Sequence, residues 1–322
     1  MVPARTLMRM MVVLACLGAA AACHREPAAP DPAQAASDAA ANAAFQQVQQ
    51  AWRAERLAQL TKPDGWASLV GMHWLDPGSH RVGSDTDNGI RLEMGPAHLG
   101  VFTVRNGATR FVADTAVTID GTAALRSALR SDADAQGPSV IAFDEGKGLA
   151  TVIARGGRLA LRVKHADADS RLRFTGLQYW DGGRDWQVPA RFIAHPAGKT
   201  LPIANIIGTT DEIPNPGAVE FERGGTTYRL EALDEGGDTL FLVFADRTSG
   251  HGSYGAGRFL DAPRPDPQGR LVIDFNQAYN PPCAFTPVAT CPLPPRENRL
   301  DLAIEAGERD YIKPPKTHKD AP

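Results

Sequence analysis

The stretch that decides the fold class reads Thr151-Val152-Ile153-Ala154-Arg155-Gly156-Gly157-Arg158-Leu159-Ala160-Leu161-Arg162-Val163. Apolar and polar residues alternate around Gly156-Gly157, which is the two-residue turn signal of a β-hairpin. Three similar dipeptides stand between alternating segments: Asn106-Gly107, Asp120-Gly121 and Gly224-Gly225. Each tolerates the positive φ angles that a type I′ turn requires. The sequence therefore predicts an all-β body and excludes a helical bundle.

Two nearly continuous apolar runs, Leu240–Phe244 and Leu271–Phe275, predict central strands that are covered on both faces. Hairpin signals give way to Gly, Asp and aromatic residues within residues 167–191, and we expect a domain boundary there. The predicted domains are a short helix with a small β-sandwich over residues 45–166, a larger β-barrel or sandwich over residues 167–313, and a tail over residues 314–322.

The first 22 residues have the layout of a secretory signal, because Arg5 and Arg9 precede a charge-free apolar run. This run is shorter than the ~20 apolar residues that a membrane-spanning helix needs. It ends in Ala20-Ala21-Ala22-Cys23, which resembles a bacterial lipobox. The resemblance implies that Cys23 is lipidated and anchors the protein to a membrane, with the outer membrane facing the periplasm as the expected location. Ordinary cleavage, giving a soluble periplasmic or secreted protein, is the alternative.

Residues 23–44 are rich in Ala, Pro and Asp and have no periodic apolar face, so we expect a disordered tether. A short amphipathic helix is predicted after it, because apolar residues recur there at three to five positions. These residues are Phe45, Val48, Trp52 and Leu57. Pro63-Asp64-Gly65 ends the predicted helix.

The formal net charge is −3, and neither sign dominates a long stretch of the chain. There is therefore no electrostatic reason to expect a nucleic acid or an anionic lipid surface as partner. We predict no cofactor. A glycine pattern at Gly250, Gly252 and Gly255 matches the letters of the dinucleotide fingerprint, but a predicted strand follows it instead of a helix.

Residues suited to binding or acid–base chemistry gather between Asp246 and Glu308. The candidate set is Arg247, Ser249, His251, Ser253, Tyr254, Arg258, Asp274, Asn276 and Asn280. The leading hypothesis is that they bind a small polar or anionic ligand in the C-terminal β domain. One alternative is a hydrolase with His251 or Asp274 as base and Ser249 or Ser253 as nucleophile. The other is a structural envelope lipoprotein.

Cys283 and Cys291 are the only cysteines after the signal region. Because an exported protein meets oxidising conditions, we predict a disulfide between them. A metal site is the competing interpretation, but the Cys-x7-Cys spacing is wider than that of a zinc knuckle and no histidine lies in the loop. We therefore predict no metal site.

Several blocks of the C-terminal half carry a family resemblance. These are Thr248-Ser249-Gly250, Asp274-Phe275-Asn276, Tyr279–Ala284, Cys291–Pro295 and Glu297–Leu300. They resemble an uncharacterised bacterial and archaeal family, the domain of unknown function family numbered 1684, over nearly everything after the tether. The resemblance implies no activity and leaves metal or redox use of the two cysteines open.

A second resemblance concerns Gly83–Leu92, which is similar to a turn and strand of forkhead-associated phosphopeptide-binding sandwiches. It implies a sandwich topology for the N-terminal β domain. Ser84 stands where that family has Arg, and no matching Ser-x-x-His is present. We therefore do not expect phosphopeptide binding.

Overall fold

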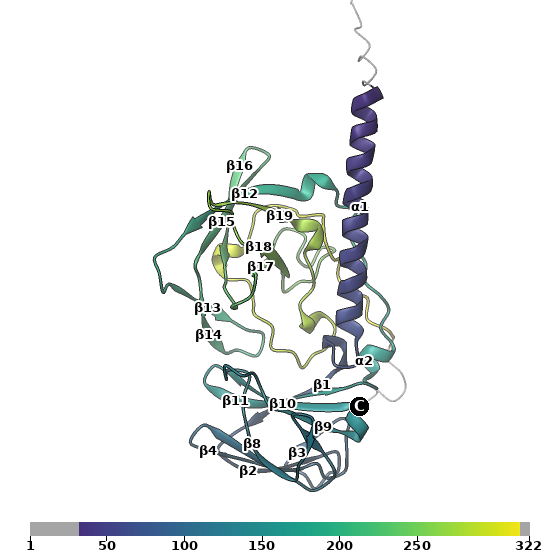
Figure 1. The fold of residues 1–322 in the computed structure, drawn as a ribbon, viewed down its shortest axis with the longest axis vertical. Helices are drawn as coiled ribbons and strands as arrows, with labels where there is room; N and C mark the ends of the chain where they lie inside the picture. Colours follow the sequence, from purple (N-terminus) through teal and green to yellow (C-terminus); the bar gives the residue numbers. More distant parts are fainter. Residues whose placement is uncertain (1–31, 316–322) are drawn as a thin grey trace, which may run out of the picture. The chain divides into compact units, whose positions relative to one another are not determined.

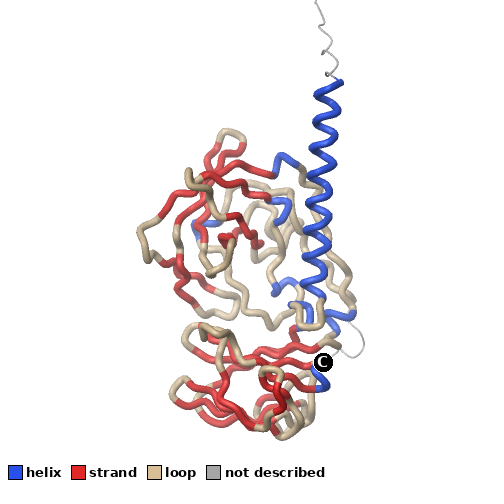
Figure 2. The backbone as a smooth tube through the Cα atoms, viewed as in Figure 1, coloured by secondary structure: helices blue, strands red, loops and turns tan. Residues whose placement is uncertain are grey.

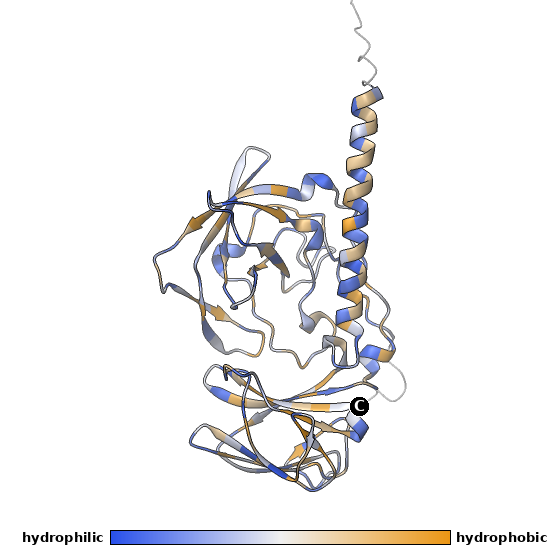
Figure 3. Ribbon diagram, in the orientation of Figure 1, coloured by the Kyte–Doolittle hydropathy of each residue, from blue (hydrophilic) through white to orange (hydrophobic). Residues whose placement is uncertain are grey.

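The computed structural model describes residues 32–315, so the predicted signal peptide and Cys23 lie outside the described residues. Most of the regular structure is β-strand, which confirms the predicted all-β fold (Figures 1 and 2). The residues from Ala44 onward form one compact unit, and the earlier part of the N-terminal helix belongs to another. No helix in the described part of the chain is long and apolar enough to span a membrane, and polar and apolar colours mix along the N-terminal helix (Figure 3).

The N-terminal helix α1 spans Pro32–Thr61. It ends just before Pro63-Asp64-Gly65, as predicted, but it begins before the predicted start at Phe45. The prediction of a disordered tether is therefore wrong for residues 32–44, because their many alanines favour a helix even without an apolar face. The predicted apolar face is only partly present, since Phe45 is buried and Trp52 half-buried, whereas Val48 and Leu57 are 55% and 40% exposed.

Two sheets form the N-terminal β region. Their strands are β1 (Leu69–Leu75), β2 (Gly78–Gly83), β3 (Ile90–Arg91), β4 (Gly100–Arg105), β5 (Ala108–Ala113), β6 (Thr118–Ile119), β7 (Thr122–Ala123), β8 (Arg126–Leu129), β9 (Val140–Phe143), β10 (Gly148–Arg155) and β11 (Arg158–His165). One sheet has the order β1-β11-β10-β9-β6-β7 and the other β3-β2-β4-β5-β8. Phe102 and Phe111 from one sheet and Val152 and Leu161 from the other share a single core, which gives a sandwich-like arrangement.

The four predicted hairpin turns are confirmed. Asn106-Gly107 joins β4 to β5, Asp120-Gly121 joins β6 to β7, and Gly156-Gly157 joins β10 to β11. Both residues of each turn have positive φ, which is the conformation of a type I′ turn. Gly224-Gly225 behaves in the same way in the C-terminal region.

The C-terminal β region has smaller sheets. Its strands are β12 (Gln187–Ala194), β13 (Thr200–Ala204), β14 (Thr210–Pro214), β15 (Gly217–Arg223), β16 (Thr226–Ala232), β17 (Thr239–Phe244), β18 (Arg258–Pro263) and β19 (Arg270–Asp274). One sheet has the order β16-β15-β12-β19, while β13-β14 and β17-β18 are two-stranded. Short helical turns precede, separate and follow the strands of the two regions: Trp66–Ser68, Asp144–Gly146, α2 (Asp169–Leu172), Arg184–Trp186, Phe275–Gln277, Pro282–Ala284 and Arg296–Asn298.

Strand β17 is covered on both faces, as predicted. Leu242 and Phe244 join a core with the four-stranded sheet, while Phe241 and Val243 join a second core that contains Cys283 and Cys291. The same prediction is wrong for β19. It is an edge strand beside β12, and its Val272 is 47% exposed. Of the two predicted forms, barrel or sandwich, the described residues form no closed barrel, because their sheets stay open, and a sandwich-like fold fits.

The two β regions have separate cores, yet the residues from Ala44 onward are one compact unit. The predicted domain boundaries and the forkhead-associated likeness therefore stay predictions.

Polar contacts attach the C-terminal half of α1 to the C-terminal β region. Gln49 donates through Nε2 to Asp274 Oδ2 at 2.7 Å. Arg56 donates through Nε to Glu308 Oε1 at 2.9 Å and through Nη2 to the carbonyl oxygen of Asn280 at 2.9 Å. The three acceptors are two carboxylates and one backbone carbonyl. Hydrogen-bond donors on α1 therefore attach the helix to this region, together with the buried side chains of Phe45 and Leu60.

Two adjacent glutamines test this attachment. Replacing Gln49, which is buried, with Ala removes a hydrogen bond to a carboxylate and should lower the free energy of unfolding by about 1–3 kcal/mol. Replacing the exposed Gln50 with Ala should change it by less than about 0.5 kcal/mol. Chemical denaturation of both variants gives the comparison, and equal losses would contradict the observed docking face.

Candidate functional site

Arg258 lies at the centre of the predicted site, but it is enclosed by protein. Its side chain is 1% exposed, and Nη2 forms an ion pair with Asp246 Oδ2 at 2.8 Å. It also donates to the backbone carbonyls of Ile304, at 2.9 Å, of Ala306, and of Glu308, at 3.3 Å. A buried charge is stable only when it is paired and hydrogen-bonded in this way. Arg258 therefore holds the loop after β17 and residues 304–308 together and has little capacity left for a ligand.

The hydroxyl residues of the predicted set belong to the same buried network. Ser253 Oγ accepts hydrogen bonds from Thr248 Oγ1 at 2.8 Å and from Trp180 Nε1 at 2.9 Å. Ser249 Oγ accepts from the backbone N–H of Asp246 at 3.1 Å. These contacts fix a tight turn. The described hydrogen bonds give neither serine hydroxyl a histidine partner, so the Ser–His arrangement of a hydrolase is not assembled here.

Arg247 and His251 lie on the surface. The Arg247 side chain pairs with the exposed Asp301 at 2.5 Å, and the His251 ring contacts only the carbonyl of Ser249, at 3.3 Å, among the described hydrogen bonds. Tyr254 is half-buried and donates its hydroxyl to the carbonyl of Cys283 at 3.2 Å. Neither these three residues nor Arg258 line any of the cavities described below.

The last three predicted residues stabilise irregular backbone. Asp274 accepts at Oδ1 from the backbone N–H of Asn276, at 3.0 Å, and at Oδ2 from Gln49 and Gln187. The Asn276 amide exchanges two hydrogen bonds with the backbone of Gly183. Asn280 donates its backbone N–H to Glu308 and its side-chain amide to the carbonyl of Arg309. The structure thus brings the predicted set into structural clusters instead of one ligand pocket.

Cys283 and Cys291 lie side by side in the second C-terminal core as free, buried thiols. The backbone N–H of Cys283 donates to the Cys291 sulfur at 3.1 Å. The hydrogen bond from Cys291 and the nearby Tyr254 hydroxyl lower the pKa of Cys283, whereas its role as donor and its burial raise the pKa of Cys291. The predicted disulfide is not tested by these positions and stays a prediction.

A cavity of about 280 Å³ lies beside the two cysteines. We call it the Arg162 cleft. Its lining residues are Arg56, Trp66, Arg155, Arg162, Glu235, Phe241, Phe259, Asp261, Tyr279, Pro282, Ala289, Thr290, Cys291 and Pro292. They come from α1, the turn Trp66–Ser68, β10, β11, the loop after β16, β17, β18 and the irregular segment 279–292. Neighbouring hollows of about 270 and 450 Å³ share several of these residues, so the cleft continues on two sides.

The basic side chains of the cleft differ in how they are neutralised. Arg56 pairs with Glu308 at 2.9 Å and Arg155 pairs with Asp132 at 2.8 Å. Arg162 is half-buried, lies 5.1 Å from the Trp66 ring and contacts Thr290 Oγ1 at 3.2 Å, but it has no ion pair within the described residues. Burial and the charge of Arg155 lower the pKa of Arg162 to about 10, which leaves it charged at neutral pH.

Two carboxylates line the same cleft. Asp261 accepts a hydrogen bond from the Tyr279 hydroxyl at 3.0 Å, and neither Asp261 nor Glu235 forms an ion pair within the described residues. Partial desolvation raises the pKa of Asp261. Partial desolvation and the charge of Asp261 also raise the pKa of Glu235. Shifted carboxyl groups in a cleft are a recognised mark of functional sites.

The sequence offered a weak signal for this cleft. Arg162 and Lys164 alternate with Leu161 and Val163 along β11, so the basic residues must share one face of the strand. Asp261 interrupts the apolar residues of β18. Neither pattern tells which other segment would face these residues, and the prediction missed both.

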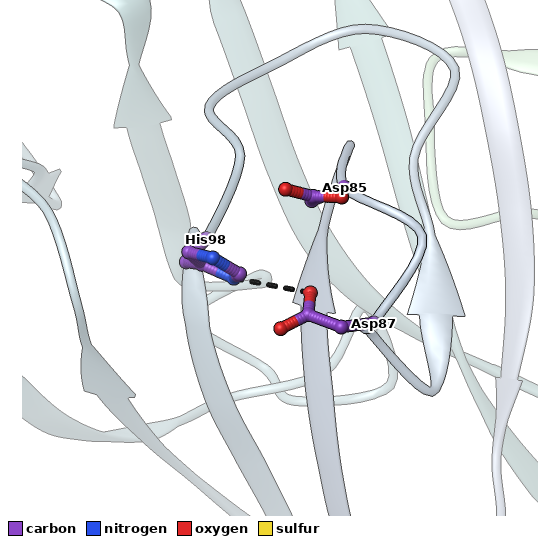
Figure 4. A group of neighbouring side chains, drawn as sticks. All are labelled: Asp85, Asp87 and His98. Atoms are coloured by element: carbon purple, nitrogen blue, oxygen red, sulfur yellow. Dashed lines mark ion pairs between the residues drawn. The ribbon is translucent and has the colours of Figure 1, made fainter.

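Two other candidates are weaker. Asp85, Asp87 and His98 offer ligand atoms within 4.8 Å of one another, and Figure 4 shows the ion pair of His98 with Asp87. All three are exposed, and Asp85 Oδ1 already accepts from the backbone N–H of Thr86, so this group gives no reason to assign a metal. A wide hollow of about 1100 Å³ along β12, β15 and β19 is open and lined mainly by exposed side chains.

The family match to known proteins lies in the C-terminal region. Residues 172–309 match the family described as "Protein of unknown function (DUF1684)". This segment belongs to that family. An uncharacterized protein of Haloarcula marismortui, solved by solution NMR, is 31% identical over a match that covers 43% of this chain and 78% of that chain, with a TM-score of 0.37. A search of curated proteins finds no significant match.

Two ion pairs of this family segment allow a matched test. Replacing Asp246 with Ala leaves the Arg258 charge buried and uncompensated, which should lower the free energy of unfolding by about 3–5 kcal/mol. Replacing Asp301 with Ala removes an exposed partner of Arg247, and the loss should stay below about 1 kcal/mol. Chemical denaturation measures both, and a small loss for Asp246→Ala would contradict the structural role of Arg258.

The cysteine pair can be tested directly. We expect that mild oxidation with oxidised dithiothreitol forms the Cys283–Cys291 disulfide, because the two thiols are already in contact. Intact mass should then fall by two hydrogen atoms, and the Cys291→Ser variant should keep its mass. A wild-type protein that retains two alkylatable thiols after this treatment would contradict the predicted bond.

Proposed function

We propose that the protein binds a small ligand with a carboxylate or phosphate group in the Arg162 cleft. The observation that carries the proposal is the half-buried Arg162 guanidinium, which lines a cavity and has no carboxylate partner within the described residues. A partly desolvated cation without a counter-charge is costly, and a ligand anion would remove that cost. Arginine is also the side chain best suited to bind planar carboxylate or phosphate groups through two hydrogen bonds.

The surroundings of Arg162 support recognition of an anion. Trp66 lies near the guanidinium, and such contacts restrict the orientation of an arginine side chain. Lys164 is two residues after Arg162 on the same face of β11, and its Nζ lies 5.0 Å from the Trp66 ring centroid. Thr290 fixes one guanidinium nitrogen from the opposite segment. The cation is therefore held in position before a ligand arrives.

The proposal keeps the class of ligand that the sequence predicts but assigns it to a different place. The predicted residues between Arg247 and Asn280 support the fold of the C-terminal region, and none of them lines the Arg162 cleft. Binding is favoured over hydrolysis because the described hydrogen bonds connect neither the Ser249 nor the Ser253 hydroxyl to a histidine. Export and lipid anchoring through Cys23 remain part of the proposal, supported by the sequence alone.

The test uses thermal unfolding with inorganic phosphate, acetate and pentanoate as probes. At least one anion should raise the melting temperature of the wild-type protein, because a ligand that binds only the folded state stabilises it. Replacing Arg162 with Met should weaken binding about 10- to 100-fold, which is the expected effect of losing a hydrogen bond from a charged group. Arg162→Lys should restore part of the affinity.

The matched control is Arg158→Met. Arg158 lies on the same face of β11 but outside the cleft, where it pairs with the exposed Asp76. This variant should bind the anions as the wild type does. The proposal fails if none of the three anions stabilises the wild-type protein at millimolar concentration, or if Arg162→Met binds as well as Arg158→Met.

A further inference from the structure

The Arg162 cleft contains a second, opposite charge that the anion site does not explain. Asp261 and Glu235 line the cleft from β18 and from the loop after β16. Asp261 contacts the Tyr279 hydroxyl, and the described residues supply no ion-pair partner for either carboxylate. The other cations of the cleft are already committed, because Arg56 pairs with Glu308 and Arg155 with Asp132.

Building on the proposed anion site, we propose that the ligand is a zwitterion whose anionic group binds Arg162 and whose ammonium group binds Asp261 and Glu235. A ligand with two anionic groups would meet repulsion from the two carboxylates. A simple organic cation would leave Arg162 without a counter-charge. Only a molecule with both charges, separated by a short spacer, neutralises all of the uncompensated groups of the cleft.

The aromatic residues of the cleft fit the remaining parts of such a ligand. Phe241 and Phe259 meet edge to face at 4.9 Å, and Phe259 and Tyr279 at 5.8 Å. All three rings line the cleft that Asp261 enters. Ring faces attract ammonium groups, and their apolar surface can cover a methylene spacer. The cavity of about 280 Å³ accommodates a small molecule of the size of an amino acid or an amino sugar acid, and the two neighbouring hollows leave room for a longer one.

The ionisation of the two carboxyl groups gives this inference a pH dependence. Partial desolvation raises the pKa of both, so they take up protons at a higher pH than ordinary carboxyl groups, whose pKa is about 4. The charged groups that face them are Arg56, Arg155 and Arg162, together with the hydroxyl of Tyr279. Because these arginines stay charged in acid, the ammonium preference should weaken as Asp261 and Glu235 take up protons, at a pH above that of ordinary carboxyl groups.

The experiment compares 5-aminopentanoate with pentanoate by isothermal titration calorimetry at neutral pH, and repeats the comparison with glycine against acetate and 6-aminohexanoate against hexanoate. At least one amino compound should bind about tenfold or more tightly than its counterpart that lacks the amine, since the added ammonium gains hydrogen bonds to charged groups. Replacing Asp261 with Asn should reduce that preference to about threefold or less, with pentanoate affinity retained.

Glu222→Gln is the control, because Glu222 is an exposed carboxylate of β15 outside the cleft. It should keep the full preference. Equal affinity of each amino compound and its counterpart would overturn the zwitterion proposal but leave the anion site intact. An unchanged preference in Asp261→Asn would overturn it as well. A titration with calcium ions is the last control, and calcium binding that requires Asp261 would overturn the zwitterion proposal in favour of a metal site. Absence of all binding would overturn the anion site too.

Discussion

The C-terminal region depends on the buried ion pair between Arg258 and Asp246. Residues 300–308 contain no strand, so their backbone carbonyls need partners from elsewhere, and Arg258 supplies donors to Ile304, Ala306 and Glu308. Asp246 neutralises the guanidinium and also accepts the backbone N–H of Ile304. A guanidinium with five donors in a fixed plane can hold several irregular segments at once, which a lysine cannot do. This pair therefore positions Glu308.

The position of Glu308 extends the same polar network to α1. Its side chain is fully buried and accepts from Asn280 on one oxygen and from Arg56 on the other. Arg56 then stacks 4.6 Å from the Tyr279 ring, at one wall of the Arg162 cleft. The residues that the sequence predicted as a site thus do not line the cleft but contact the segments that do. They fix the backbone and the helix on which its lining side chains stand.

The predictable part of the fold is the part that local sequence determines. Each hairpin follows from two turn residues and the alternation beside them, and all four were found. Coverage on both faces was predicted for β17 and β19, and it is correct for β17 only. An apolar residue such as Val272 on an edge strand looks the same in sequence as one in the centre of a sheet. The docking face of α1 was missed because Gln49 and Arg56 become buried only against Asp274 and Glu308, about 220 to 250 positions later in the chain. Arg258 was predicted as a ligand-binding residue, whereas its side chain is buried against Asp246, which composition does not reveal.

The cleft shows why the family match leaves its ligand open. Asp261, Tyr279 and Cys291 belong to the matched segment, whereas Arg56, Trp66, Arg155 and Arg162 lie outside it. The wall with Asp261 and Tyr279 therefore lies within the matched family segment. The wall with Arg56, Arg155 and Arg162 comes from α1 and the N-terminal sandwich of this chain. Arg162 is half-buried, Asp261 and Glu235 are exposed, and none of the three has an ion pair within the described residues, although they line one cavity. A ligand with both charges would pair with all three, across a cleft whose two walls come from different parts of the chain.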